Sequence, residues 1–304
     1  RRSGKCGGFF KGHYFRGYVV LSELINNKID PDAYRYARED LPPIKNPLLY
    51  VYGALAKLFL YAFFGVGSVV LGIVVFPIER LLIHPKLRFQ KAARSTVSFM
   101  FRFFINVMRC LGVVRFQTAD KEKFRSLSSK IVVANHPSML DVVFLISLIP
   151  NADCIVRGSL ANSMYASVIR QLYIVNTLGY EEMIDFCKKS LATGTNLIVF
   201  PEGTRTPRNG TNAFKKGAAR MALDTHCDIL PVYIGGSDKY GLGKHDAFFS
   251  YARSGVYRYN IYMLDEIKIA DYESLEPQIA AKRITEKIHQ TIADKALLVD
   301  NRVL

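Results

Sequence analysis

The chain has 304 residues, half of them hydrophobic, which is enough for one large domain with appendages and a sizeable core. Its 41 Lys and Arg outweigh its 26 Asp and Glu to give a net charge of +15, which indicates an anionic partner, either nucleic acid or an anionic membrane surface with phosphate-bearing substrates. The cysteines are scattered, odd in number and never in a C-x-x-C pair, which argues against a disulfide framework or a zinc site and favours a reducing cytoplasm. They are Cys6, Cys110, Cys154, Cys187 and Cys227.

Residues 1–46 are basic and rich in aromatic side chains but show little periodicity. Residues 19–25 are compatible with a short helix or a short strand, and the prolines at positions 31, 42 and 43 interrupt whatever surrounds them. We find no pattern of catalytic residues here. We therefore predict a basic N-terminal tail that lies on the surface or is loosely ordered.

Residues 58–78 contain no charged side chain. About 20 helical residues cross a hydrocarbon core of roughly 30 Å, so this stretch has the length of a membrane span. It lies too far from the start of the chain, and lacks the small-residue cleavage pattern, for a signal peptide. A buried core helix and a re-entrant membrane helix are the alternatives, and basic residues on both sides leave the orientation undecided.

Residues 94–112 predict a second helix, whose polar side chains form one narrow stripe on an otherwise apolar surface. The stripe consists of Ser95, Ser98, Arg102, Asn106 and Arg109. Two interpretations remain open. The helix lies at a membrane interface with its basic stripe toward lipid headgroups, or it packs between the first helix and the rest of the protein.

A short β-branched strand at residues 131–133 leads directly into the sequence Ala-Asn-His, with His136 as its last residue. We expect a helix to begin at Pro137, because proline suits the first helical turn, and to place Asp141 one turn further on. A carboxylate near a histidine can fix its tautomer and stabilise the imidazolium. One such pair is common in proteins and does not identify a catalytic site by itself.

A second strand, at residues 196–200, is followed at once by Pro201, Glu202, Gly203, Thr204, Arg205 and Thr206. In open α/β sheets, ligands bind beyond the carboxyl ends of the strands. Two strands that both end in polar loops therefore predict one shared site, to which His136 and the second loop contribute.

The remaining pattern alternates strands and helices, which indicates an α/β fold. The expected strands lie near residues 154–156, 173–175 and 229–234, with one or two edge strands in 248–264. The expected helices lie near residues 164–170, 181–193, 216–226 and 277–297. Gly194 is the predicted C-terminal cap of the second of these helices.

The sequence NHPSMLD, from Asn135 to Asp141, resembles the N-H-x4-D motif of the glycerolipid acyltransferases, and FPEGTRT resembles their F-P-E-G-T-R-S motif, with Thr206 in place of Ser. Two further segments, FKKG at 214–217 and the strand at 229–234, are similar to stretches of the same family. The resemblance covers about residues 114–265. It implies a mixed sheet flanked by helices, with N-terminal membrane-associated helices. The expected organisation is a tail at 1–46, membrane-anchoring helices at 47–113 and an acyltransferase domain with a closing helix at 114–304.

The resemblance implies transfer of a fatty acyl group from a thioester to the hydroxyl of a lysophospholipid, with 1-acylglycerol-3-phosphate as the first candidate. His136 is then the general base and Asp141 its support, while Glu202, Gly203, Thr204 and Arg205 bind the acceptor. No metal or cofactor is implied beyond acyl-CoA or acyl carrier protein as the donor substrate. The implied partner is a phospholipid membrane rather than nucleic acid, with the catalytic domain facing the cytoplasm.

One position departs from the family pattern. Asn176 stands where the family usually has an arginine that binds the acceptor phosphate. This departure favours considering another acceptor, such as an ornithine-type lyso-lipid or a specialised lipid. Four basic residues are candidates for the missing charge, namely Arg157, Arg170, Lys215 and Lys216.

Two functions of another class remain as alternatives. The charge and the aromatic residues permit a non-catalytic basic protein that binds membranes, lipids or nucleic acid, although the basic residues are spread along the chain and no nucleic-acid-binding motif occurs. A metal hydrolase that uses His136, Asp141 and Glu202 lacks any supporting ligand spacing.

Overall fold

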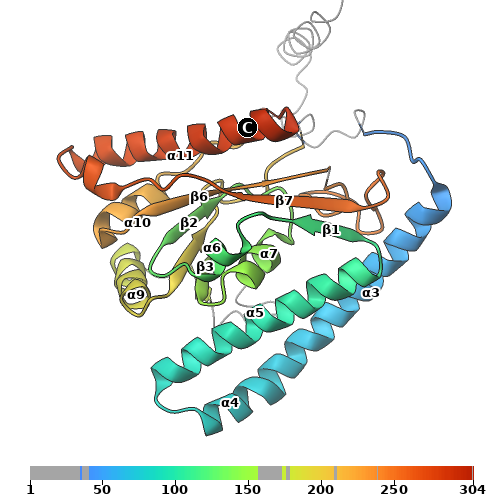
Figure 1. Ribbon diagram of the computed structural model, residues 1–304, viewed down its shortest axis with the longest axis horizontal. Coiled ribbons are helices and arrows are strands. Elements are labelled where there is room, and N and C mark those ends of the chain that lie inside the picture. The colour runs from blue at the N-terminus through green and yellow to red at the C-terminus, as the bar shows by residue number, and fades with distance from the viewer. Residues whose placement is uncertain are drawn as a thin grey trace, which may run out of the picture.

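The computed structural model describes residue 35 and residues 41–156, 173–175, 179–208, 211–237, 239–302 and 304. The short element expected at 19–25, the helix expected at 164–170, and Arg157, Arg170 and Asn176 lie outside these residues. The described part forms a mixed sheet covered by helices on both faces (Figure 1).

The described sheet has seven strands in the order β1-β7-β6-β2-β5-β3-β4. Their bounds are β1 Val114–Gln117, β2 Ile131–Ala134, β3 Ala152–Val156, β4 Tyr173–Val175, β5 Asn196–Val199, β6 Ile229–Gly235 and β7 Tyr257–Met263. β7 is antiparallel to β6, and every other neighbouring pair is parallel. The predicted α/β fold with a mixed sheet is therefore confirmed.

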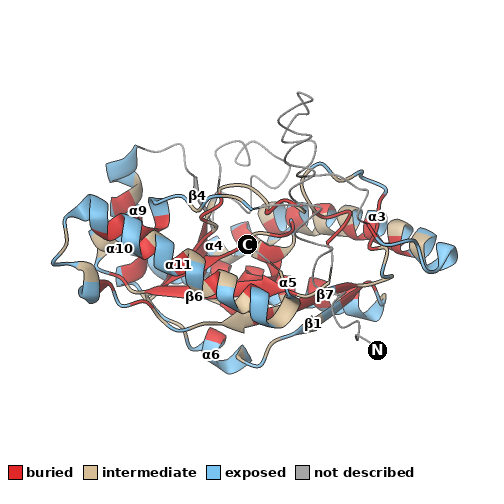
Figure 2. Ribbon diagram, turned by 90° about the horizontal axis from the view of Figure 1, so that it is seen from above, coloured by how far each residue is buried: buried red, intermediate tan, exposed pale blue. Residues whose placement is uncertain are grey.

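Side chains of the central strands alternate between two hydrophobic cores, because successive residues of a strand point to opposite faces. Ile131 and Val133 pack with helices α9 (Tyr180–Ala192), α10 (Gly217–Thr225) and α11 (Pro277–Asp300). Val132 and Ala134 pack with α7 (Asp141–Leu148) and with the N-terminal helices. Figure 2 shows the buried residues concentrated in the strands between these two helical layers.

The N-terminal helices form a long hairpin. α3 (Pro47–Val70) continues through a π-helical turn, η1 (Leu71–Val75), into α4 (Phe76–Leu82), and α5 (Lys86–Cys110) runs back beside them (Figure 1). Asn46 caps the start by accepting hydrogen bonds from the first backbone N–H groups of α3. Within the part of the chain that the structure describes, the helix over Pro47–Leu82 is the one long and apolar enough to cross a membrane.

The hairpin is attached to the sheet domain by buried polar contacts. The ammonium of Lys57 donates to the carbonyl oxygens of Gly241, at 3.1 Å, and Ser250. Arg94 forms a bidentate ion pair with Asp153 of β3, with N–O distances of 2.7 and 2.8 Å. The helix expected at 94–112 therefore contacts the rest of the protein, as the packing interpretation predicts.

Two expected elements differ in detail from the structure, and a third agrees with it. α5 begins at Lys86 rather than at residue 94. The segment expected to supply edge strands contributes β7, which lies inside the sheet between β1 and β6. In β7 the polar residues Arg258 and Asn260 alternate with buried aromatic residues, and this alternation is also typical of an edge strand. The helix expected near 181–193 is α9, and Gly194 follows it with a positive φ of 79°, as predicted for a C-terminal cap.

Candidate active site

The two sequence motifs meet at the carboxyl ends of two paired strands. β2 and β5 are parallel neighbours, with Val133 beside Val199, so the loops that follow them lie side by side. The backbone N–H of Thr206 donates to the carbonyl oxygen of His136 at 2.7 Å. In return, the backbone N–H of His136 donates to the carboxylate of Glu202 at 3.0 Å. The motifs are thus joined by direct hydrogen bonds, as the shared-site prediction requires.

His136 and Asp141 form a hydrogen-bonded pair. Nδ1 of His136 lies 2.8 Å from Oδ2 of Asp141, whose side chain is fully buried. The imidazole also stacks on the ring of Phe200, with 4.2 Å between centroids. Because Nδ1 is engaged by the carboxylate, Nε2 is the nitrogen left to face a substrate.

The local backbone differs from the expected one. The helix begins at Asp141 rather than at Pro137, and residues 135–140 form a loop. Ser138 explains this difference, because its backbone N–H and its hydroxyl both donate to the Asp141 carboxylate, at 2.8 and 2.6 Å. These bonds hold the loop in a turn that places the Asp141 carboxylate beside His136.

A buried tyrosine extends this network. The hydroxyl groups of Ser138 and Tyr259 lie 2.8 Å apart, and both residues are buried. Burial, together with the charge of Asp141, raises the pKa of Tyr259 well above its usual value, so the phenol stays protonated. A carboxylate only accepts, so Ser138 donates to Asp141 and Tyr259 donates to Ser138.

Glu202 is buried and connects parts of the protein rather than facing the cavity. One carboxylate oxygen accepts from His136 and from the hydroxyl of Thr206, and the other accepts from the amide of Asn212 at 2.7 Å. Among the described residues it makes no ion pair with Arg205. A role for Glu202 in binding substrate stays a prediction, and the geometry adds a role in holding the two motif loops together.

Gly203, Thr204 and Arg205 line a cavity of about 900 Å³, as does His136. Nη1 of Arg205 donates to the carbonyl oxygens of Leu242 and Gly243, at 3.0 and 2.9 Å. Gly203 has a φ of +64°, and a Cβ there would lie 2.9 Å from the ammonium of Lys215. Glycine therefore allows both the left-handed turn and the approach of Lys215, which also lines the cavity.

The cavity combines a cationic part with an apolar part. Basic side chains in its wall belong to Lys57, Arg205, Lys215, Arg220 and Lys244. The N-terminal hairpin contributes apolar side chains, namely Leu60, Phe64, Phe101, Phe104 and Met108. Such a cavity suits an amphiphile that carries an anionic headgroup.

Two candidate nucleophiles close to His136 are poorly suited to that role. Cys154 lines the cavity, but burial raises the pKa of its thiol, which keeps it protonated. Ser138 is fully buried and occupied by Asp141 and Tyr259. His136 is the group whose position suits proton removal from a bound hydroxyl.

Sequence reasoning missed several residues of this site. Tyr259 lies 121 positions from Ser138, and Lys57 reaches carbonyls more than 180 positions away, so no local pattern connects them. Asn135 is the first residue of the motif that contains His136, and the sequence alone predicts no role for it. Its amide pairs with the backbone of Ile234, donating at 2.9 Å and accepting at 2.8 Å, and so fixes the end of β2 against β6.

Comparisons with known proteins agree with these observations. Residues 115–235 match the family model described as Acyltransferase. The 1-acyl-sn-glycerol-3-phosphate acyltransferase of Borreliella burgdorferi is 25% identical over 202 residues, which cover 62% of this chain and 80% of that protein. The human 1-acyl-sn-glycerol-3-phosphate acyltransferase beta is 23% identical over 141 residues, covering 43% and 50%. The fold resembles that of the crystal structure of the 1-acyl-sn-glycerophosphate (LPA) acyltransferase PlsC from Thermotoga maritima, with a TM-score of 0.64, 18% identity and coverage of 82% and 97%.

Proposed function

Because this chain belongs to the glycerolipid acyltransferase family, we propose that it transfers a fatty acyl group from a thioester donor to the free hydroxyl of 1-acylglycerol-3-phosphate. The observation that carries this proposal is the His136–Asp141 pair, at 2.8 Å, beside a cavity that has both cationic and apolar walls.

His136 acts as the general base. The acceptor hydroxyl gives its proton to Nε2 while its oxygen attacks the thioester carbonyl, and the tetrahedral intermediate then expels the thiolate, which takes the proton from the imidazolium. Asp141 holds the tautomer and stabilises the imidazolium. This route needs no acyl-enzyme, which agrees with the absence of an exposed serine or deprotonated thiol among the described residues around His136.

Arg205 and Lys215 bind the phosphate of the acceptor. The two N–H groups on Nη1 of Arg205 are bound to the backbone of residues 242 and 243, which holds the guanidinium in place. Nη2 and Nε can then form the planar fork that matches two phosphate oxygens. Lys215 lies close to Gly203 and supplies a positive charge in place of the arginine that the family usually has where this chain has Asn176.

The hairpin of α3, α4 and α5 lies in one leaflet of a membrane and delivers the apolar chains to the cavity. Its outer side exposes many large apolar residues, which include Phe59, Val66, Ile73, Leu81 and Phe99. Its inner side is bonded to the sheet domain through Lys57 and Arg94. A helix bonded to the domain in this way is not surrounded by lipid on all sides, which favours insertion from one face over a full crossing.

The catalytic domain faces the cytoplasm in this proposal. All four cysteines within the described residues are free thiols, as is usual for proteins in a reducing compartment. The charge of +15 suits the anionic cytoplasmic leaflet.

Lipid mass spectrometry tests the proposed reaction. The full chain in detergent is incubated with acyl-CoA or acyl carrier protein and a pool of lyso-lipids that includes lysophosphatidate and an ornithine-type lyso-lipid. We expect phosphatidate as the main new product. Acylation of another lyso-lipid alone would leave the chemistry in place and reject this acceptor, and hydrolysis of the thioester without any acylated lipid would reject the transfer reaction itself.

A further inference from the structure

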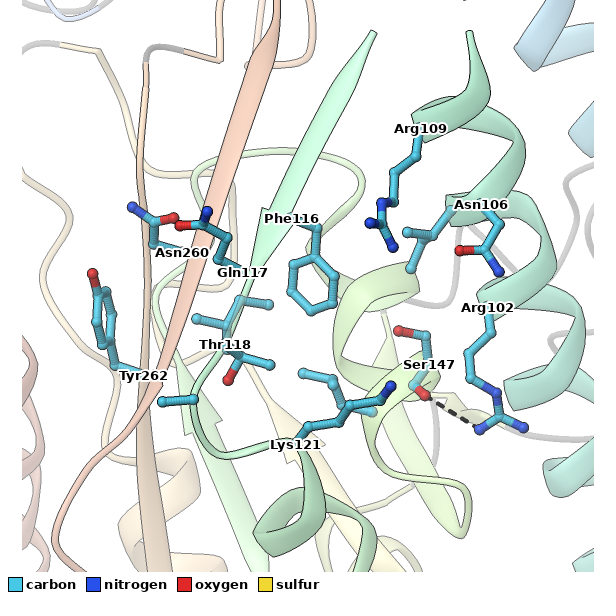
Figure 3. Close-up of a pocket in the computed structure, with 14 residues that line it drawn as sticks. Arg102, Asn106, Arg109, Phe116, Gln117, Thr118, Lys121, Ser147, Asn260 and Tyr262 are labelled. Carbon is cyan, nitrogen blue, oxygen red and sulfur yellow. Dashed lines mark hydrogen bonds between the residues drawn. The ribbon is translucent and has the colours of Figure 1, made fainter. Parts of the chain in front are cut away.

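A second cavity, of about 630 Å³, lies apart from the first one (Figure 3). α5 contributes Arg102, Asn106 and Arg109, the end of β1 contributes Gln117 and Thr118, and α6 (Lys121–Arg125) contributes Lys121. Figure 3 shows these side chains around a space beside Phe116. Three of them belong to the polar stripe that the sequence displays on this helix, and the proposed reaction uses none of them.

The topology of the sheet separates this cavity from the reaction site. β1 is parallel to β7, β7 is antiparallel to β6, and β6 is parallel to β2, so β1 and β2 run in opposite directions. His136 follows the carboxyl end of β2, whereas Gln117 is the carboxyl end of β1. α7 runs from the reaction site toward the second cavity. Asp141, its first residue, belongs to the reaction site, and Ser147, near its end, lines the second cavity. The two cavities therefore lie toward opposite ends of the sheet.

The second cavity carries uncompensated positive charge. Among its described lining residues none is acidic, and Arg102, Arg109 and Lys121 form no ion pair within the described part of the chain. Arg102 instead donates to the hydroxyl of Ser98 at 3.2 Å and to the carbonyl of Ser147 at 3.4 Å. Burial lowers the pKa of Arg102 from its usual value, and the nearby charge of Arg125 lowers it further. Three cations that gather without a counter-ion favour a bound anion.

The position of the cavity indicates the kind of anion. Phe99 and Phe103 are exposed on α5, and Phe103 lies next to Arg102 in the helix. Residues three, four and seven apart share one side of a helix, so the exposed phenyl rings border the stripe that holds Arg102, Asn106 and Arg109. An apolar surface beside a cationic cavity is the arrangement expected at the headgroup level of a bilayer.

We propose that this cavity binds a phosphate-bearing anion, and that its position beside Phe99 and Phe103 makes the headgroup of an anionic phospholipid the favoured source. Arg102 and Arg109 lie two helical turns apart and approach the ligand from α5, while Lys121 approaches from the start of α6. Gln117, Thr118 and Asn106 supply neutral donors to further phosphate or glycerol oxygens. This site fixes how the hairpin sits on an anionic membrane, independently of whether the acyl-transfer proposal holds.

Chemical protection of Lys121 tests the site. The full chain is acetylated with an N-hydroxysuccinimide ester, and mass spectrometry compares Lys121 with Lys123, which is 74% exposed and lies outside the cavity. The protein is measured with phosphatidylcholine vesicles, with vesicles that also contain phosphatidylglycerol, and with inorganic phosphate alone. At a ligand concentration about ten times Kd, acetylation of Lys121 should slow by about tenfold, because only the unoccupied fraction reacts. Lys123 should change little.

Two variants with the same change in net charge locate the effect. We expect Arg102→Gln with Arg109→Gln to abolish the protection, and Arg109→Gln alone, at an exposed position, to weaken it by about tenfold. Arg115→Gln with Arg283→Gln removes two exposed arginines outside the cavity and should retain it. Protection by the phosphatidylglycerol vesicles alone identifies a lipid site, and equal protection by free phosphate identifies a soluble ligand with the same chemistry. Absence of protection in both arms, equal protection of Lys123, or protection that survives in the first variant would overturn the proposal.

Discussion

At the scale of single residues, the position of His136 depends on a chain of hydrogen bonds that is entirely buried beyond Asp141. Asp141 accepts two bonds from Ser138, and Ser138 in turn contacts the hydroxyl of Tyr259. These bonds keep one carboxylate oxygen directed at Nδ1 of His136. Ser138 and Tyr259 are therefore positioning residues for the proposed base.

We predict that Ser138→Ala lowers kcat by about ten- to a hundredfold, the value of one hydrogen bond to a charged group, and that Tyr259→Phe lowers it less. Steady-state kinetics measures kcat, and thermal unfolding of the same preparations measures stability. A fall in kcat that is fully accounted for by unfolded protein would assign the two residues to folding alone.

Arg205 supports a second prediction at this scale. Arg205→Lys should raise the KM for the acceptor by about tenfold or more, because one ammonium cannot bind the carbonyls of residues 242 and 243 and also grip a phosphate. The KM for the acyl donor should change little. Lys216→Ala, in a neighbouring basic residue that does not line the cavity, is the matched control. An unchanged acceptor KM would remove Arg205 from phosphate recognition.

The sequence predicts those residues of this site that lie close together along the chain, and it does not predict those that only the tertiary structure brings together. His136 and Asp141 are five residues apart, so a local motif reveals both of them. Tyr259 reaches Ser138 because β7 is inserted between β1 and β6. No local sequence pattern predicts the pairing of strands that are far apart along the chain. Glu202 lies in a recognisable motif, yet its buried contacts with His136 and Asn212 depend on tertiary structure.

At the scale of elements, Arg94 is the main polar attachment of α5 to the sheet. Its ion pair with Asp153 is buried, and the hydroxyl of Ser190 in α9 donates to the same carboxylate at 3.0 Å. Asp153 lies in β3, so one carboxylate connects two helices through a strand. The sequence shows a helix here but not this contact, because the predicted polar stripe begins at Ser95 and Arg94 lies beside it.

We predict that Arg94→Ala lowers the free energy of unfolding by about 3–5 kcal/mol, because it leaves the Asp153 carboxylate buried without a counter-charge. Arg88→Ala, at an exposed position of the same helix, should change it by less than about 0.5 kcal/mol. Arg94→Met combined with Asp153→Leu should recover much of the loss. Denaturant titrations in detergent measure these differences, and an unaltered unfolding midpoint for Arg94→Ala would contradict the attachment.

At the scale of the whole molecule, the two helical layers have different outer surfaces. α11 covers one side of the sheet, and the hairpin covers the other (Figure 1). The hairpin also exposes many large apolar side chains. The uncharged stretch at residues 58–78 predicts an apolar helix, but length and composition alone do not separate a crossing helix from one that is bonded to its own domain. The contacts of Lys57 show that the first half of α3 is bonded to the sheet domain.

We predict that Val66→Glu with Ile73→Glu weakens binding to phospholipid vesicles by more than about a hundredfold, because two exposed apolar residues of the hairpin become charges. Ile279→Glu with Leu298→Glu places the same charges on exposed positions of α11 and should leave vesicle binding nearly unchanged. Vesicle flotation measures both variants. Equal loss in the two variants would reject the hairpin as the membrane-binding surface.

The most direct test of the proposed mechanism is the rate of acyl transfer by His136→Ala. We predict a loss of about 10²- to 10⁴-fold in kcat, with an unchanged unfolding temperature and unchanged vesicle binding. His226→Ala, at a position where the side chain is 75% exposed and outside the cavity, is the matched control and should keep wild-type turnover. Near-normal acyl transfer by folded His136→Ala would contradict the general-base assignment and the account of the site built on it.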